Sequence, residues 1–365
     1  MKYKTIAGHR VSCVGIGGHF GKMEEGEFEH RYTQMEPSEI HRRTALVERA
    51  VAGGINYLDT TWRNEVDMLA QTLQPLDRDT VYVNGMVLGA FTGSKAMGMD
   101  VCDYFDKWMD MRLQAMPGHY FDSFMINAIE EQYDEASCEK LVRLLERRKQ
   151  NGDCRVIGFS CHDHQLARRI ADRFDAFEVV MLAYNYSNRK LEQAFEGYQG
   201  KASLVAMKPL IWAEYGIPFC AVNDLPNPAL VLGREPSDAV ATEAIRWLAA
   251  KDNIRCAVVA VNSEQELDQL LAAGNAQDGA IDEDLLAAYR QASHAQRSIP
   301  FFLAASRGDT DNRRRRYFGL SNLARALGIP YPDISLNDDQ SDKELTALRE
   351  RLFAEAGRQG FGAYL

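Results

Sequence analysis

Four consecutive residues, Cys161, His162, Asp163 and His164, form the densest group of side chains in the sequence that could do chemistry. An imidazole changes charge near neutral pH, so His162 is suited to act as a general acid or base. His162 and His164 could instead ligate a metal, but no third ligand follows at a suitable spacing, and we predict no metal site. Cys161 could act as a nucleophile. The cluster favours acid–base chemistry at His162.

A second group follows an apolar run in the stretch INYLDTTWRNE, residues 55–65. Asp59 would be a buried carboxylate, which needs a cation or several hydrogen-bond donors. It either supports catalysis or is a structural group held by backbone amides, and the sequence leaves both open. Trp62 could form a stacking wall or plug the core, and Arg63 could hold a carboxylate or a phosphate.

These groups would be positioned by short apolar runs that alternate with amphipathic stretches. The apolar runs are typical of strands covered on both faces, and they lie at residues 11–16, 55–58, 80–84, 121–127, 154–160, 177–182, 203–208 and 256–261. The clearest helical patterns, each with Ser or Asp near its start, lie at residues 38–54, 134–153, 237–253 and 263–275. Eight strands alternating with helices predict a closed (β/α)8 barrel, with an open doubly wound sheet as the alternative.

In such a barrel the active site lies at the C-terminal ends of the strands. Among the polar residues there, we predict Asp59, His162 and Lys208 as the acid–base groups. Lys208 could pair with Asp59, act as a base or contact a phosphate. The side chains expected to line the mouth and bind a small polar substrate are His19, Trp62, Arg63, Asn64, Asn84, Asn127 and Tyr184. Glu130 also follows a predicted strand. Tyr184 could serve as a proton-donating acid.

The composition narrows the choice of partners. The chain has 365 residues and a net charge of −10, which argues against nucleic acid or an anionic membrane surface as the main partner. Its seven scattered cysteines form no CxxC pair, so we expect reduced thiols. No signal peptide is visible, and no apolar run approaches the roughly 20 residues that span a bilayer. We therefore expect a cytoplasmic protein with a small-molecule substrate, and the oligomeric state stays open.

The pattern changes after residue 300. We predict a barrel over residues 1–299 and a helical C-terminal extension over 300–365 that packs on the barrel. The basic run Arg313–Arg316 could bind a phosphorylated group, although such runs are more often solvated or ion-paired helix faces.

The order of segments resembles the aldo-keto reductase family over about residues 1–275. The resemblance rests on VSCVGIGG, AVAGGINYLDTT, FDSFMIN, NGDCRVIGFSCH, FEVVMLAYN, LVAMKPL and AIRWLAAKDNIRCAVVAVNSEQELDQLLA, in that order. The forms MKPL and IGFSCH look most like a bacterial branch of the family. The resemblance implies a (β/α)8 barrel that reduces carbonyl groups with NADPH.

The family's catalytic groups are an aspartate, a tyrosine, a lysine and a histidine, and the resemblance places only the first here. Asp59 matches the aspartate, whereas Asn64 stands where the tyrosine is expected. Met86 stands at the lysine position and Asn127 at the histidine position. The resemblance thus implies a degenerate catalytic tetrad.

The cofactor contacts implied by the resemblance are also altered. Ser160 is retained, and Asn262 and Ser263 begin the last loop, so we predict these three as cofactor-binding residues. Cys161 replaces the usual asparagine, which makes it a substitution rather than a nucleophile. Methionines stand near two positions that hold the nicotinamide in the family, and carboxylates occupy the last loop where a cation often binds the 2′-phosphate: Met181, Met207, Glu264, Glu266 and Asp268. We therefore predict weak or absent NADPH binding.

Three functions remain open from the sequence. The first is an aldo-keto-reductase-like oxidoreductase that uses NADP(H) or NAD(H) and a rearranged proton relay on a small polar carbonyl or hydroxyl substrate. The second is a cofactor-independent lyase or isomerase that uses the same acid–base groups. The third is a non-catalytic ligand-binding relative.

Overall fold

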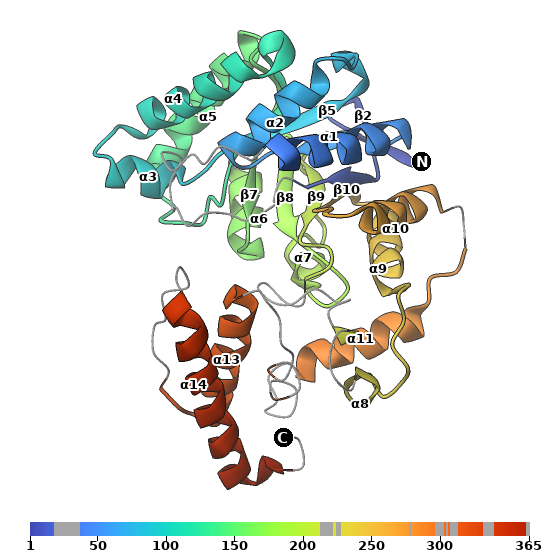
Figure 1. Ribbon diagram of the computed structural model, residues 1–365. Helices are drawn as coiled ribbons and strands as arrows, with labels where there is room; N and C mark the ends of the chain where they lie inside the picture. The colour runs from blue at the N-terminus through green and yellow to red at the C-terminus, as the bar shows by residue number, and fades with distance from the viewer. Residues whose placement is uncertain are drawn as a thin grey trace. The chain divides into compact units, whose positions relative to one another are not determined.

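The structure is a computed structural model that describes residues 1–17, 37–211, 222–223, 228–276, 279–295, 303, 306, 313–330 and 339–362 (Figure 1). Its residues group into two compact units. Unit 1 comprises Met1–Leu210 with Thr242–Ile281, and unit 2 comprises Ile211–Ala241 with Asp282–Leu365. The boundary predicted at residues 299 and 300 was drawn from the change in sequence pattern. The structural division differs from this boundary: residues 211–241 and 282–299 belong to the same compact unit as the residues after 299.

Unit 1 is built around a closed barrel of eight parallel strands, with the order β10-β3-β4-β5-β6-β7-β8-β9 around the ring. The strands are β3 (Val14–Ile16), β4 (Tyr57–Asp59), β5 (Tyr82–Val87), β6 (Phe121–Ile126), β7 (Cys154–Cys161), β8 (Val179–Ala183), β9 (Ser203–Met207) and β10 (Ile254–Val259). Neighbouring strands pair in parallel throughout, as between β4 and β5 or β10 and β3. The predicted (β/α)8 barrel is confirmed, and the open doubly wound sheet is excluded.

An antiparallel hairpin precedes the barrel and was not predicted. Strands β1 (Tyr3–Ile6) and β2 (His9–Ser12) pair with each other, and the chain changes sheet at Cys13. The prediction of one strand over residues 11–16 is therefore wrong, because a continuous apolar run hides the change of sheet. Ile6 and Val11 belong to the same buried cluster as the barrel interior, so the hairpin closes the N-terminal end of the barrel.

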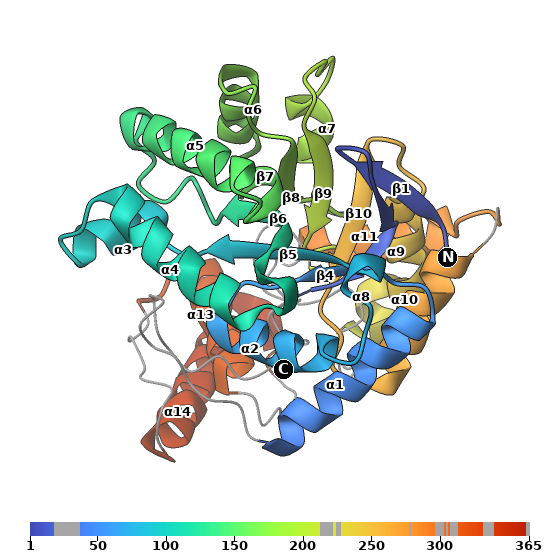
Figure 2. The same cartoon turned by 90° about the horizontal axis from the view of Figure 1, so that it is seen from above.

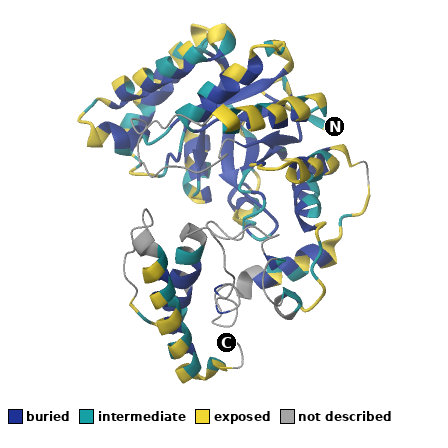
Figure 3. Cartoon of the chain, viewed as in Figure 1, coloured by how far each residue is buried: buried dark blue, intermediate teal, exposed yellow. Residues whose placement is uncertain are grey.

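Helices surround the strands in unit 1, and the outward faces of these helices are exposed while the strands are buried (Figures 2 and 3). They are α1 (Pro37–Ala52), α2 (Arg63–Leu73), α3 (Ala90–Ala96), α4 (Val101–Ala115), α5 (Glu135–Gln150), α6 (His164–Arg173), α7 (Lys190–Ala194), α9 (Val240–Ala249), which begins at the border between the units, and α10 (Glu264–Asn275). Side-chain caps fix several starts, including Asp134 for α5, Asp163 for α6 and Ser263 for α10.

The barrel interior is filled by alternate residues of the strands. The rings of Tyr57 and Tyr82, on neighbouring strands, stack with their centroids 5.2 Å apart. A Cβ atom at Gly15 would lie 2.8 Å from the ring of Tyr57, so only glycine lets β3 approach this ring. Methionines contributed by β5, β6 and β8 occupy much of the remaining space: Met86, Met125 and Met181.

Unit 2 contains α8 (Pro228–Leu232), α11 (Glu283–Ala295), α13 (Arg313–Leu327) and α14 (Asp339–Ala356). Helices α13 and α14 pack against each other around leucines such as Leu323, Leu345 and Leu352. Arg316, in the predicted basic run, pairs with Asp342 of α14 at 2.9 Å, so this side chain belongs to an ion-paired helix face. The side chains of residues 313–315 lie outside the described residues. Among the described residues, no helix is long and apolar enough to cross a membrane.

Candidate active site at the C-terminal end of the barrel

Asp59, at the end of β4, heads a chain of buried polar side chains. Asp59 is only 6% exposed. Its Oδ1 accepts a hydrogen bond from the amide Nδ2 of Asn84 at 2.7 Å. Asn84 in turn accepts a hydrogen bond from the hydroxyl of Ser123 at 2.5 Å. The register of the strands aligns these residues, because Asp59 pairs with Asn84 and Asn84 with Ser123. The geometry therefore gives Asp59 a neutral amide partner in Asn84, whereas the family resemblance implies a lysine partner, at the position that Met86 occupies here.

The loop after β4 turns into α2, whose first residue is Arg63. The buried carboxylate of Glu65 accepts hydrogen bonds from the backbone N–H groups of Thr61 and Trp62, each at 2.8 Å. Arg63 lies 3.7 Å from the carboxylate of Asp67, one turn further along the same helix, and its Nη1 lies 3.9 Å from a methionine sulfur of α4. These contacts lie along α2 and against α4, and the predicted role of Arg63 at the barrel mouth stays a prediction.

The other two predicted residues of this loop serve its local structure. Asn64 accepts a hydrogen bond from the N–H of Glu65 at 3.0 Å, which is a contact within the first turn of α2. Trp62 is half-buried at the N-cap position of the same helix. Neither residue supplies the phenol that the family uses as its acid.

Asn127 and Ser160 come together between the neighbouring strands β6 and β7. The Asn127 amide donates to the Sδ of Met86 at 3.0 Å and to the hydroxyl of Ser160 at 3.3 Å. The Ser160 hydroxyl also accepts from the N–H of Ala128 at 2.9 Å, and its carbonyl accepts from the N–H of Ile129 at 2.9 Å. Ser160 therefore fastens the loop after β6 onto the end of β7.

His162 pairs with Glu130, and this pair is the principal titratable group at the C-terminal end. The Nδ1 atom of His162 lies 2.5 Å from Oε1 of Glu130, and the two side chains are 22% and 21% exposed. Burial acts to raise the pKa of Glu130, but the hydrogen bond and charge of His162 outweigh it and hold that pKa below its ordinary value. The pair is thus an ionised carboxylate against an accessible imidazole.

Cys161 lies beside this pair but is not activated. Burial, followed by the charge of Glu130 and a hydrogen bond to it, raises the pKa of the Cys161 thiol well above its ordinary value. The thiolate is the nucleophilic form of cysteine, so this environment disfavours a nucleophile. The sulfur lies 3.2 Å from the carbonyl oxygen of Asp163.

The remaining histidine of the cluster is structural. His164 is buried, and its Nε2 lies 2.7 Å from the carbonyl oxygen of Ala183 at the end of β8. The Asp163 carboxylate accepts from the N–H of Leu166 and caps α6. Within the described part of the chain, no group of three or more His, Cys, Asp or Glu side chains could hold a metal ion.

Tyr184 is directed toward Glu192 rather than toward a substrate position. Its phenol donates to the Glu192 carboxylate at 2.6 Å. Burial and this hydrogen bond raise the pKa of Tyr184 far above its ordinary value, which makes it a poor proton donor. Nearby, Lys208 is half-buried after β9 with a φ angle of 55°, and its carbonyl accepts a hydrogen bond from Asn185 at 3.0 Å. Lys208 therefore occupies the predicted strand end.

The last loop of the barrel, after β10, is held by α1. Arg42 donates to the carbonyl oxygen of Asn262, and Arg43 donates to its side-chain oxygen at 3.2 Å. Both arginines also bond to Glu39. The Ser263 hydroxyl accepts from the N–H of Glu266 at 3.2 Å and caps α10. Two cations thus stand beside the loop where we expected only repulsion of a phosphate.

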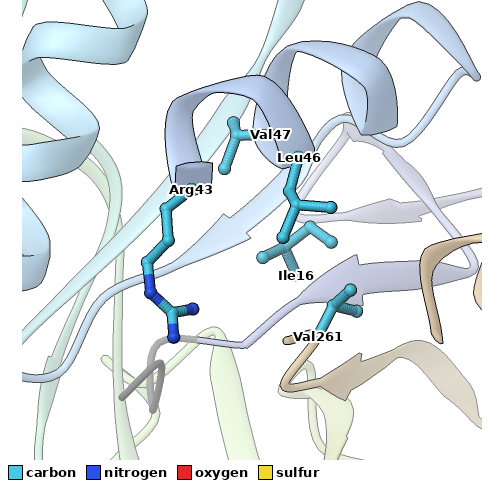
Figure 4. A pocket seen from close by; sticks show the side chains of 5 residues that line it. All are labelled: Ile16, Arg43, Leu46, Val47 and Val261. Atoms are coloured by element: carbon cyan, nitrogen blue, oxygen red, sulfur yellow. The ribbon is translucent and has the colours of Figure 1, made fainter. Parts of the chain in front are cut away.

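The acidic side chains of this loop are largely compensated. Glu264 and Asp268 both pair with Arg49 of α1, and Glu266 accepts from the N–H of Asn262 at 2.6 Å. Figure 4 shows a small pocket beside these contacts, which is lined by Arg43 and four aliphatic side chains: Ile16, Leu46, Val47 and Val261. The electrostatic argument against a phosphate at this loop is therefore weaker in the structure than in the sequence.

One predicted binding residue, His19, lies outside the described residues. Two residues of the site, Ser123 and Glu130, were not predicted as site residues from the sequence. Ser123 could have been found, because it lies two residues before Met125 on β6 and therefore points to the same, inward side of the barrel. It also pairs with Asn84 on β5. Glu130 follows a predicted strand, but nothing in the sequence shows that it reaches His162.

Comparisons with known proteins agree with this architecture. No protein-family model matches the sequence, and no curated protein matches it. Among solved structures, the holo form of aldo-keto reductase AKR11C1 from Bacillus halodurans matches with a TM-score of 0.58 and 17% identity, over 80% of this chain and 96% of that chain. An aldo-keto reductase from Klebsiella pneumoniae, solved in complex with NADPH, matches with a TM-score of 0.55 and 17% identity, over 80% and 96%. At this identity the likeness concerns the fold: the chain contains a barrel with the fold of the aldo-keto reductases.

Proposed function

We propose that this chain is an enzyme with the aldo-keto reductase fold that acts on a small polar carbonyl or hydroxyl substrate at the C-terminal end of the barrel. The observation that carries the proposal is the His162–Glu130 pair, an accessible imidazole held at 2.5 Å by an ionised carboxylate. A positioned imidazole of this kind contributes typically 10²–10⁴-fold through proton transfer. His162 thus replaces the tyrosine that the family resemblance requires.

The other predicted groups divide into anchoring and binding roles. Asp59 is engaged by Asn84, so we assign it an anchoring role in the wall of the site. Asn127, half-buried beside Ser160, is the amide best placed to hydrogen-bond a substrate oxygen. Lys208 supplies the cation at the end of β9. Together these groups suit a small substrate with hydroxyl or carbonyl oxygens.

Oxidoreduction with a nicotinamide cofactor is the reaction suggested by the fold relatives, one of which was solved in complex with NADPH. Arg42 and Arg43, beside the last loop, fit the phosphates of a dinucleotide. The nicotinamide end does not fit equally well. Met181 is buried within the barrel core, and the Ser160 hydroxyl already accepts hydrogen bonds from the loop after β6. We therefore assign proton transfer to His162 and derive no step through the cofactor.

A cofactor-independent lyase or isomerase is the second candidate. It is favoured by the His162–Glu130 pair, because acid–base chemistry at this pair needs no cofactor. It is also favoured by Met181, which offers no hydrogen bond to a nicotinamide amide.

The decisive experiment is a titration of the protein with NADPH and NADH, followed by quenching of its tryptophan fluorescence. Saturation at micromolar concentrations would support oxidoreduction, and small aldehydes, ketones and alcohols would then be assayed. If neither nucleotide binds at millimolar concentration, oxidoreduction is rejected, and elimination and isomerisation are assayed instead. His162→Gln should abolish whichever activity is found. His119→Gln, at an exposed histidine bonded to the carbonyl of Leu113, is the control.

A further inference from the structure

The position of Glu130 is set by β7 itself. The loop after β6 is tied to Ser160 by two backbone hydrogen bonds, from Ala128 to the hydroxyl and from Ile129 to the carbonyl oxygen. Ala128 adopts a φ angle of 44°, which is uncommon for a residue with a side chain. Glu130 follows directly and meets His162, two residues beyond Ser160. The strand that carries the imidazole therefore also places its carboxylate partner.

This contact has a consequence for the imidazole ring. In a neutral imidazole one ring nitrogen carries a hydrogen and the other carries a lone pair. An ionised carboxylate can only accept a hydrogen bond, so the Nδ1 of His162 must be the nitrogen with the hydrogen. Nε2 then carries the lone pair. A ring in this state accepts protons, whereas the family's tyrosine donates them.

We propose that Glu130 is a positioning residue that holds His162 in the Nδ1–H tautomer, so that Nε2 removes a proton from a hydroxyl group of the substrate. The inference rests on the proposed function and narrows it to hydroxyl-bearing substrates. In this step the substrate O–H bond breaks, its proton joins Nε2, and the electron pair stays on the substrate oxygen. The imidazolium that forms faces the Glu130 carboxylate, which stabilises it.

The neighbouring titratable groups do not compete for this role. The Cys161 thiol is buried and stays protonated. The Asp163 carboxylate is occupied in capping α6. Among the described neighbours of the ring, Glu130 is thus the carboxylate bonded to it.

The first test measures the tautomer and needs no substrate. The ¹⁵N chemical shifts of His162 would be recorded in the full-length protein at a pH where the ring is neutral. We expect a hydrogen on Nδ1 in the wild type and in Glu131→Ala, a matched control because Glu131 is the exposed neighbour of Glu130. In Glu130→Ala we expect the hydrogen to move substantially to Nε2. A wild-type ring with its hydrogen on Nε2, or a tautomer unchanged in Glu130→Ala, would overturn the proposal.

The second test separates positioning from binding. Glu130→Ala should lower kcat for a hydroxyl substrate by about 100-fold with little change in KM, since it removes orientation and charge. Glu130→Gln retains an acceptor for Nδ1 but loses the charge, so its loss should be smaller, about tenfold. An unchanged kcat in Glu130→Ala contradicts the proposal. If His162→Gln retains full activity, the proposed function itself fails, and the tautomer measurement still decides how Glu130 acts on the ring.

Discussion

At the N-terminal end of the barrel, the Asp122 carboxylate is 2% exposed and is bonded by Arg78 at 2.8 Å, by Arg155 at 3.0 Å and by the N–H of Val83 at 2.9 Å. At the C-terminal end, Glu130 keeps one-fifth of its surface exposed and faces an imidazole. The first carboxylate is buried between two guanidinium groups, whereas the second faces a partly exposed imidazole.

The difference shows which end of the barrel can do chemistry. A buried carboxylate held between two guanidinium groups is an internal ion pair, and breaking such a pair is strongly destabilising, so it serves stability. The His162 imidazole keeps about one-fifth of its side chain exposed, so a ligand can reach it. This division matches the general rule that catalysis in such barrels lies at the C-terminal face and stability at the N-terminal face.

The largest expected effect is the loss of Asp122. Asp122→Ala would leave two arginines facing a buried gap, and we expect the free energy of unfolding to fall by about 3 kcal/mol or more. Urea denaturation followed by circular dichroism measures this change. Asp79→Ala removes a highly exposed partner of Arg155 and serves as the control, with a much smaller effect. Equal losses in the two variants would contradict the assignment of the N-terminal end to stability.

At the C-terminal end of the barrel, we expect a substitution to reduce turnover strongly and stability only slightly. His162→Gln should reduce kcat by about 100-fold or more, yet change the free energy of unfolding by only about 0.5 kcal/mol. The assay uses the substrate identified after the nucleotide titration, and thermal unfolding measures the stability. A variant that unfolds readily but retains full turnover would show that His162 is structural.

The buried polar chain in the barrel wall is intermediate between these extremes. Asn84→Ala removes the donor to the Asp59 carboxylate, and we expect a loss of about 2 kcal/mol, because bonds to charged groups are stronger than neutral ones. The double variant Asp59→Ala/Asn84→Ala should recover part of that loss, which a double-mutant cycle would show. Strict additivity would mean that the two side chains do not interact.

Most of the fold was predictable, because strand and helix signals are local. The strand predicted at 154–160 is observed at Cys154–Cys161, and the helix predicted at 263–275 is observed at Glu264–Asn275 with its serine cap. The hairpin that closes the barrel was missed because the break at Cys13 lies inside an apolar run. A change of sheet leaves no trace in hydropathy.

The site was predictable only in part, because its contacts depend on loop conformation. Asn127 and Ser160 were predicted separately, as substrate-binding and cofactor-binding residues, and their hydrogen bond was not foreseen. Arg63 was predicted at the barrel mouth, and its contact with Asp67 along α2 could not be read from the sequence. The pairing of Glu130 with His162 depends on a left-handed residue, Ala128, which no sequence signal indicates.

The smallest expected effect is a pH dependence of the free energy of unfolding that comes from Lys4, in the hairpin that closes the N-terminal end of the barrel. Lys4 donates from the β1–β2 hairpin to the carbonyl oxygens of Lys251 and Ile254, each at 2.6 Å. Burial, partly offset by the nearby Cys13, lowers the pKa of Lys4 from 10.5 to about 8. Below pH 8 the lysine is charged in both states, so its burial opposes folding in full. Between pH 8 and 10.5 only the unfolded chain retains the proton, and the free energy of unfolding rises with pH.

Burial also raises the pKa of Cys13, which acts in the opposite direction at higher pH, so the comparison must be made against a variant. The difference in unfolding free energy between wild type and Lys4→Met should shift in favour of the wild type from pH 7 to 9. Chemical denaturation at several pH values measures it, and Lys2→Met, at an exposed position of the same segment, should show no such trend. A flat difference would mean that Lys4 is solvated, and that the hairpin closes the barrel through Ile6 and Val11 alone.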